Sequence, residues 1–276
     1  YDFSSAKKII NNAINDSIFP GASVVILKNG KKVFNFQSGY QTYEKKIKID
    51  SESIYDLASL TKVVATTPVA MKLYSQKRLP LDEPIKDFIP IFSGEEKNKV
   101  TIRHLLTHSS GLMAFDTFPI DFSKDKILAE IIKKPLINDP GSEYVYSDFG
   151  PILLKNILEI VSNKKFEKLS SNYIFKPLKM KNTFFNPLPK YLKNIVPTEV
   201  DTIYDRGLLK GIVHDERAWQ LGGVAGHAGL FSTTDDLAKY CQMMINGGHL
   251  GGIRYFNSNL INKFIEKQNL PEGSNR

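Results

Sequence analysis

A serine and a lysine stand three positions apart in residues 58–62, which read Ala-Ser-Leu-Thr-Lys. Residues 59–73 are apolar over a length that predicts a buried helix beginning near Ser59. Positions i and i+3 share a helix face, so the Lys62 amine can point at the Ser59 hydroxyl. A serine becomes a good nucleophile when a base takes its proton, and a neutral lysine can be that base. Taken alone the pattern is common, and an N-capping serine followed by an exposed lysine is the simpler explanation.

A tyrosine forms the second candidate, in residues 144–150 (Tyr-Val-Tyr-Ser-Asp-Phe-Gly), which follow Pro140 and Gly141. The phenol of Tyr146, at the mouth of a helix, could relay a proton between a nucleophile, a lysine and a leaving group. In isolation, a core aromatic with a satisfied hydroxyl explains this residue better.

The rest of the chain predicts a small sheet followed by many helices, an α+β organisation. Two β-rich runs, 22–28 and 31–38, are joined by Asn29-Gly30, a strong hairpin signal. Apolar residues at helical spacing predict a helix within 3–18. Further helices are predicted over residues 102–106, 127–133, 150–161, 166–173 and 234–245.

Composition excludes several classes of protein. The 276 residues are 42% hydrophobic and 24% charged, values typical of folded chains, and no apolar run approaches the ~20 residues of a membrane span. The single cysteine, Cys241, excludes an internal disulfide and a multi-cysteine zinc site, and its apolar neighbours predict a buried thiol. The net charge is +8, but the lysines are scattered and arginines are few, which argues against a nucleic-acid partner.

Several spaced segments together resemble the serine β-lactamase and penicillin-binding-protein superfamily, most of all its class C-like esterase branch. The segments are Ser59-x-x-Lys62, residues 107–112 (THSSGL), residues 140–141 with 146–148 (YSD), and residues 226–233 (GHAGLFST). The resemblance runs from about residue 20 to residue 248. It implies a β-lactamase/transpeptidase-like fold, an antiparallel sheet with a large helical lobe. It also implies one domain over 1–276, with a sheet part at 1–55 and about 200–276 and a helical lobe at about 56–200.

The resemblance assigns roles to three residues. Ser59 would be the acylated nucleophile, Lys62 its base, and Tyr146 the proton relay, with the Ser59 N–H as half of an oxyanion hole. It calls for no metal or organic cofactor. The implied substrate is a small ester, an amide or a peptidoglycan-like molecule. The sequence does not decide the cellular compartment, although the family resemblance implies a periplasmic or secreted protein. It does not decide the oligomeric state either.

The sequence departs from the family pattern at two places. The family's Tyr-x-Asn is Tyr146-Ser147-Asp148 here, and an ionised aspartate cannot donate a hydrogen bond to a substrate carbonyl. An aspartate near Lys62 also favours the charged lysine, so either Asp148 points elsewhere or the substrate differs from a β-lactam. This departure favours ester hydrolysis.

The second departure concerns the family's third motif, Lys-Thr-Gly or His-x-Gly on a late strand. The one candidate is residues 227–229 (His-Ala-Gly), which we expect to lead into a helix and not a strand. We therefore expect the chain to be a C-terminally truncated fragment that ends before the third motif. Asp148, His227 and Gly229 are the substrate-binding candidates, although a structural role for His227 is the simpler one.

Two hypotheses about the function remain open. The first is a serine hydrolase acting through an acyl-enzyme, with esterase ahead of D-Ala-D-Ala peptidase and β-lactamase third. The second is a non-catalytic relic of the same fold that binds peptidoglycan or another ligand. Residues 214–216 (His-Asp-Glu) do not have metal-ligand spacing. The family resemblance implies that Asp215 or Glu216 braces the loop above the cleft.

Overall fold

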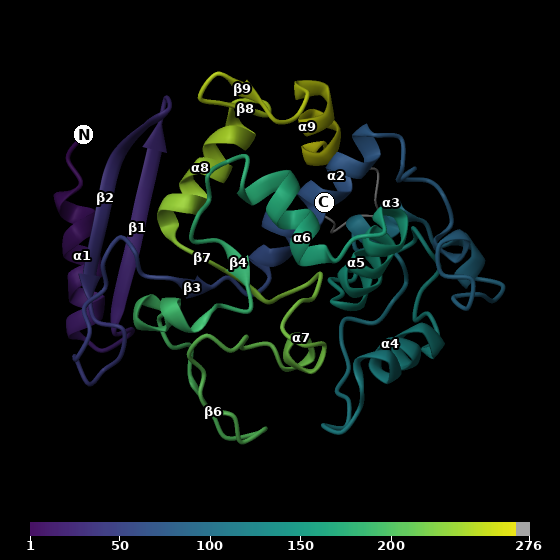
Figure 1. Cartoon of the computed structure of the whole chain (residues 1–276), viewed down its shortest axis with the longest axis horizontal. Coiled ribbons are helices and arrows are strands. Elements are labelled where there is room, and N and C mark those ends of the chain that lie inside the picture. The colour runs from purple at the N-terminus through teal and green to yellow at the C-terminus, as the bar shows by residue number, and fades with distance from the viewer. Residues whose placement is uncertain (269–276) are drawn as a thin grey trace.

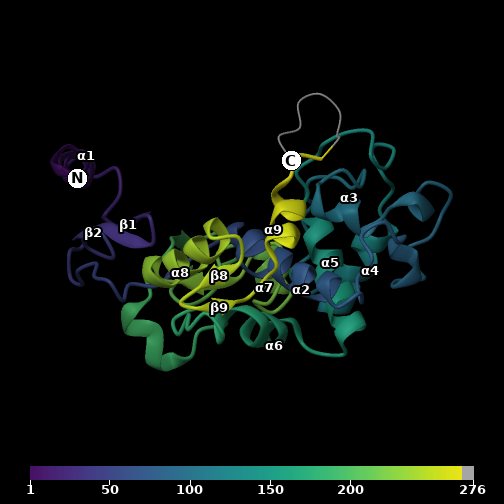
Figure 2. The same ribbon diagram turned by 90° about the horizontal axis from the view of Figure 1, so that it is seen from above.

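The computed structural model describes residues 1–268, and its first unit is a helix packed on a hairpin. Helix α1 (Ser4–Asn15) precedes the antiparallel strands β1 (Gly21–Lys28) and β2 (Lys31–Gly39). The predicted hairpin is confirmed, and both turn residues between the strands have positive φ, as a tight two-residue turn requires. The Phe3 ring lies 4.7 Å from that of Phe34 and fixes α1 to β2. Figures 1 and 2 show this unit at one end of the molecule.

A three-stranded antiparallel sheet of very short strands lies at the centre of the fold. Its order is β3 (Tyr55–Asp56), β7 (Leu230–Ser232), β4 (Phe184–Phe185). It is the one sheet in residues 1–268 that has more than two strands. Two further strand pairs are β5 (Val200–Asp201) with β6 (Gly207–Leu208), and β8 (His249–Leu250) with β9 (Ile253–Arg254).

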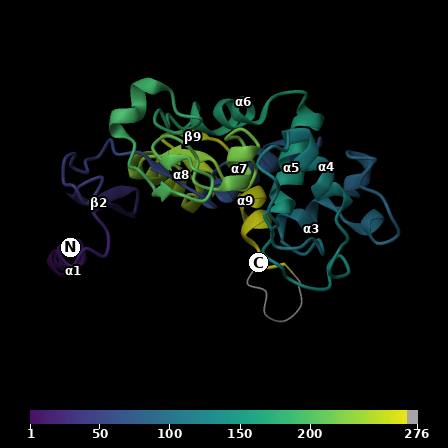
Figure 3. The same ribbon diagram turned by 90° about the horizontal axis from the view of Figure 1, so that it is seen from below.

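Apart from α1, the helices form most of the core, and several of them lie at the end of the molecule opposite the hairpin (Figure 3). A π-helical turn, Lys62–Thr66, leads directly into α2 (Thr67–Ser75), which packs against α5 and α6. The others are α3 (Ile102–Leu106), α4 (Lys124–Lys133), α5 (Phe149–Ser162), α6 (Phe166–Ser170), α7 (Glu216–Gln220), α8 (Thr234–Ile245) and α9 (Ser258–Ile265), with a second π turn at Ser171–Phe175. Three 3₁₀ turns complete the set: Ile85–Asp87, Lys97–Lys99 and Pro189–Asn194.

The core explains why α2 and α5 are so apolar. Buried side chains of α2, including Val69 and Leu73, meet those of α5, including Leu153 and Ile157, in one large cluster. Within residues 1–268, no helix has the length and apolar character needed to cross a membrane.

The structure corrects two expectations. A strand, β7, follows His227-Ala228-Gly229 before helix α8 begins, whereas a helix alone was predicted there. Leu230 and Phe231 are buried between β3 and β4, so distant pairing partners, and not local sequence, make this segment extended. Cys241 is exposed and not buried, because it lies on the outer face of α8.

Candidate active site

Ser59 stands on a tight turn between the central sheet and the π turn. Ala58 has a φ of +45°, a left-handed conformation that is uncommon for a residue with a Cβ. The Ala58 N–H donates to Asp56 Oδ1 at 2.8 Å, and the Leu57 N–H donates to the Leu230 carbonyl at 2.8 Å. Burial raises the pKa of Asp56, against the hydrogen bonds that it accepts from His214 and Ala58. The bend before Ser59 is thus held by β7 on one side and by Asp56 on the other.

Lys62 is buried and directed at Ser59. Its Nζ donates to Ser59 Oγ at 2.9 Å and to the His227 carbonyl at 3.2 Å. The Leu230 N–H donates to the Thr61 hydroxyl at 3.1 Å, and the Thr66 hydroxyl donates to the Gly226 carbonyl at 2.6 Å. These bonds dock the first helical turn against the glycine-rich segment, residues 222–229 (GGVAGHAG), and against the start of β7, so the lysine is held in place.

Tyr146 lies beside the lysine and is partly open to solvent. Lys62 Nζ is 4.9 Å from the centroid of the Tyr146 ring, a cation–π distance, and the side chain is 40% exposed. The His108 ring also packs on that of Tyr146, with 4.6 Å between their centroids. The Ser147 N–H donates to His108 Nδ1 at 3.0 Å, which anchors the segment that carries the tyrosine.

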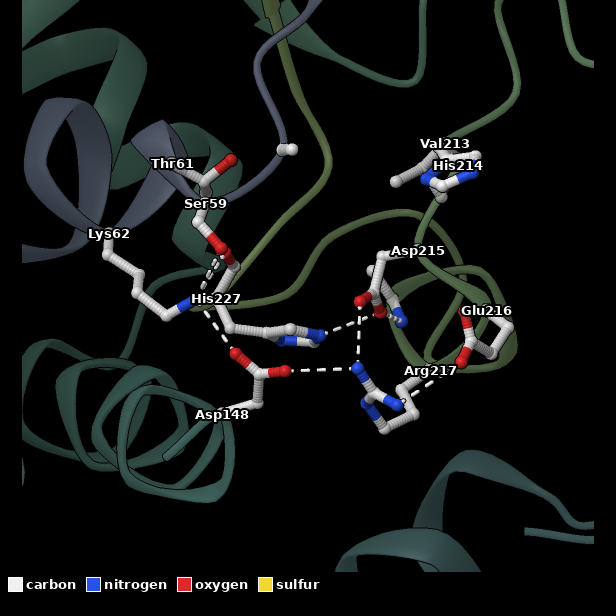
Figure 4. Close-up of polar contacts among 12 residues, drawn as sticks. Ser59, Thr61, Lys62, Asp148, Val213, His214, Asp215, Glu216, Arg217 and His227 are labelled. Atoms are coloured by element: carbon white, nitrogen blue, oxygen red, sulfur yellow. Dashed lines mark hydrogen bonds and ion pairs between the residues drawn. The ribbon is translucent and has the colours of Figure 1, made fainter. Parts of the chain in front are cut away.

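Asp148 joins the serine–lysine pair to an arginine, as Figure 4 shows. One carboxylate oxygen is 2.8 Å from Lys62 Nζ, and the other accepts from Arg217 Nη2 at 3.0 Å. The side chain therefore does not point elsewhere: it lies between two cations. Arg217 is buried and contacts a second carboxylate, that of Asp215, at 3.0 Å.

Asp215 connects the arginine to His227. Its Oδ1 lies 2.8 Å from His227 Nε2 and also accepts from the Ala218 N–H at 2.8 Å, which caps α7. Burial alone raises the pKa of Asp215, but the His227 hydrogen bond and the charges of His227 and Arg217 outweigh it and hold the pKa well below its usual range. The expectation that Asp215 braces a loop at the site agrees with these contacts.

Three potential metal ligands come together here, one atom each from Asp148, Asp215 and His227, all within 4.8 Å of one another. The Arg217 guanidinium bonds both carboxylates and so already supplies a positive charge between them. A metal ion would have to displace a buried arginine, so the donor set fits an internal ion-pair network better than a metal centre.

The structure brings Ser59, Lys62, Tyr146 and Asp148 together, whereas His227 and Gly229 take different positions. The His227 side chain is 1% exposed and its imidazole faces Asp215, so its backbone carbonyl is what reaches the lysine. Gly229 has a φ of +108°, and a Cβ there would lie 2.4 Å from the Gly223 carbonyl oxygen, which indicates a packing role. Sequence reasoning missed Arg217, for which the only signal was its place beside Asp215.

Comparisons with known proteins identify the family of the chain. The β-lactamase family profile matches residues 6–271. The chain belongs to the β-lactamase family. Members of this family are serine hydrolases, and the expected β-lactamase/transpeptidase-like α+β fold is confirmed.

Three relatives illustrate the match. A protein of Escherichia coli strain K12, provisionally named a D-alanyl-D-alanine carboxypeptidase, is 34% identical over 89% of this chain and 64% of its own length. The octameric penicillin-binding protein homologue from Pyrococcus abyssi has a TM-score of 0.79 and 25% identity, covering 95% of this chain and 60% of that one. A class C β-lactamase from Rhodobacter sphaeroides shares the fold, with a TM-score of 0.76 and 18% identity; the match covers 93% of this chain and 69% of that one. The chain thus spans about two thirds of the length of these proteins.

Proposed function

We propose that this protein is a serine hydrolase that forms an acyl-enzyme on Ser59. The observation that carries the proposal is the 2.9 Å contact between Ser59 Oγ and Lys62 Nζ, with the lysine buried and the serine on a strained turn. Strain and a paired buried base are features that cluster at catalytic sites. A purely structural N-capping serine needs neither.

The proposed reaction has two steps. In the first, the Ser59 hydroxyl proton passes to Lys62 as Oγ bonds to the substrate carbonyl carbon, and the bond to the leaving group then breaks. Tyr146, beside the Lys62 amine, relays a proton to the departing oxygen or nitrogen. In the second step, water attacks the acyl carbon, gives up a proton through the same groups and releases Ser59. The Ser59 N–H would stabilise the oxyanion as one of its hydrogen-bond donors.

The substrate class rests on two considerations. The names of two curated relatives, both provisionally D-alanyl-D-alanine carboxypeptidases, support peptides that end in D-alanyl-D-alanine as substrates, alongside the esters favoured from sequence. Asp148 is engaged by Lys62 and Arg217 and offers no amide donor to a β-lactam side chain. We therefore infer a carbonyl substrate held without that donor, an ester or a D-amino-acid peptide.

The test is intact-mass analysis after exposure to a fluorophosphonate probe. Wild type should gain one adduct, Ser59→Ala should gain none, and the control Ser75→Ala, on the exposed end of α2, should react like wild type. Circular dichroism checks that each variant is folded. Equal labelling of Ser59→Ala would remove Ser59 from the mechanism. A folded wild type that gains no adduct would favour the ligand-binding relic.

A second assay separates the substrate classes. Release of D-alanine from a diacyl-lysyl-D-alanyl-D-alanine peptide, compared with hydrolysis of a p-nitrophenyl ester, ranks peptidase against esterase. Activity on the ester alone would leave the carboxypeptidase name without support in this chain.

A further inference from the structure

The charged side chains of the site form a closed circuit of contacts and not a chain with free ends. Its five members are, in order, Lys62, Asp148, Arg217, Asp215 and His227, with the His227 carbonyl returning to Lys62. Figure 4 shows the circuit from the lysine to the histidine. Its members come from the π turn, the start of α5, helix α7 with its cap, and the glycine-rich segment before β7.

The two oxygens of Asp148 serve different cations. Oδ1 faces Lys62 Nζ at 2.8 Å, and Oδ2 faces Arg217 Nη2 at 3.0 Å. An unshared carboxylate at this distance strongly favours the charged form of a lysine, which opposes its use as a base. An arginine, which never loses its proton in proteins, offsets that field with a fixed positive charge.

We propose that Arg217 is a positioning residue that shares the charge of Asp148 and so keeps Lys62 able to accept the Ser59 proton. The inference rests on the proposed function of Ser59 and Lys62. It resolves the conflict that Asp148 poses, because the aspartate fixes the lysine amine in space while the arginine limits how strongly it holds the proton.

Arg217 is itself held in place from several sides. Its side chain is 8% exposed, and Asp215 and Glu216 accept from its two terminal nitrogens. The Phe115 ring lies 5.1 Å from the guanidinium carbon. The preceding loop is tied down by the His214 N–H, which donates to Asp56 Oδ2 at 2.7 Å. An arginine with this many fixed partners cannot swing away from Asp148.

The groups that face Lys62 are few, which makes its titration interpretable. They are Ser59 from its own turn, Tyr146 and Asp148 from the segment leading into α5, and the His227 carbonyl from the glycine-rich segment. Arg217 and Asp215 act on the lysine through Asp148 and His227.

The experiment follows the titration of Lys62 directly, by NMR of protein labelled with 13C at lysine Cε, with the signal assigned by Lys62→Met. Arg217→Gln should move the pH at which Lys62 loses its proton upward by about one unit, the effect of a nearby unit charge. Arg217→Lys, which keeps the charge, should stay within about 0.3 units of wild type. The double variant Arg217→Gln/Asp148→Asn should return close to wild type, because both opposed charges are gone.

Two results would overturn the proposal. One is a folded Arg217→Gln protein whose Lys62 titrates as in wild type, and the other is a double variant that titrates like Arg217→Gln alone. Should Arg217→Gln fail to fold, Asp148→Asn is compared with the double variant: because Asp148→Asn keeps the Arg217 charge, its Lys62 midpoint should lie about one unit below that of the double variant. Equal midpoints would refute the charge-sharing role.

The titration does not depend on turnover, so it separates this inference from the proposed function. If wild type gains a fluorophosphonate adduct, the pH profile of labelling should move upward in Arg217→Gln by the same amount as the NMR midpoint. If wild type gains no adduct, the acyl-enzyme proposal fails, while the NMR result still decides whether Arg217 acts on Lys62.

Discussion

Gly226 provides a stringent test of how the site is assembled, through the substitution Gly226→Ala. A Cβ at this position would lie 1.9 Å from the Pro151 carbonyl oxygen and 2.9 Å from Lys155 Cβ, whereas real Cβ atoms keep at least 3.0 Å from other heavy atoms. The glycine-rich segment must therefore move away from α5 by about 1 Å. Gly226 does not have a positive φ, so the effect is one of space and not of backbone strain.

The cost has two parts. Forcing a methyl group into a packed contact costs about 1–3 kcal/mol. The movement also weakens the 2.6 Å hydrogen bond from Thr66 to the Gly226 carbonyl, worth about 1 kcal/mol. We expect the free energy of unfolding to fall by about 3 kcal/mol. Because His227 is the next residue, Lys62 also loses its carbonyl partner, and labelling of Ser59 should slow by about tenfold or more.

The assay is urea denaturation followed by circular dichroism, together with the rate of fluorophosphonate labelling. Gly150→Ala is the matched control: it lies on α5, and its Cβ would come no closer than 3.3 Å to Leu105 O, so alanine's better helix propensity offsets the tight contact. We expect the free energy of unfolding of Gly150→Ala to stay within about 1 kcal/mol of the wild-type value. A Gly226→Ala protein as stable and as reactive as wild type would refute the packing argument.

Two other predictions concern the same site. Ala58→Gly should keep the free energy of unfolding within about 1 kcal/mol of the wild-type value, whereas Ala58→Val should lower it by about 2 kcal/mol, because a β-branched residue tolerates positive φ poorly. Equal urea stabilities of the two variants would contradict this prediction. The pKa of Asp215 is lowered by folding, so its stabilisation is present above about pH 4 and is lost as pH falls through the folded value. Asp215→Asn should therefore be less stable than wild type by about 2–3 kcal/mol near neutral pH, and the difference between the two urea midpoints should become smaller as the pH falls. A difference that does not depend on pH would contradict this prediction.

The sequence alone predicted the helices and strands whose structure depends mainly on neighbouring residues. The hairpin follows from Asn29-Gly30. The predicted helices over 102–106 and 234–245 have the observed bounds, because each is preceded by a threonine, Thr101 or Thr233, whose side chain caps the first turn. The strand β7 was missed because three residues carry no readable alternation. Its extended form depends on partners far away in the chain.

The candidate active site also has contacts that local spacing predicted and contacts that only the fold determines. The contact between Ser59 and Lys62 was predictable from their spacing on one helical turn. The position of Asp148 was posed as a choice between facing the lysine and facing away, and only the fold decides it. Arg217 lies 69 residues further along and could not be placed by any local pattern. No compensating cation was predicted beside Asp148, so the positive charge that Arg217 supplies there is a finding of the structure.

The π turn at Lys62–Thr66 has a consequence for which insertions and deletions the chain can tolerate. Its wider winding, with the Thr67 N–H bonded to the Lys62 carbonyl, holds one more residue than an α-helical turn would. Deleting one residue from this turn would let an ordinary α-helical turn form, so the flanking segments could keep their orientation while the side chains inside the turn shift by one position. Lys62 and Thr66 lie at the two ends of the turn and bond the carbonyls of His227 and Gly226, and after the deletion they could no longer reach both. The wide turn therefore sets the separation of two side chains that dock on consecutive residues of another segment. Single-residue deletions here should abolish labelling, whereas equivalent deletions in the 3₁₀ turn Pro189–Asn194 should not.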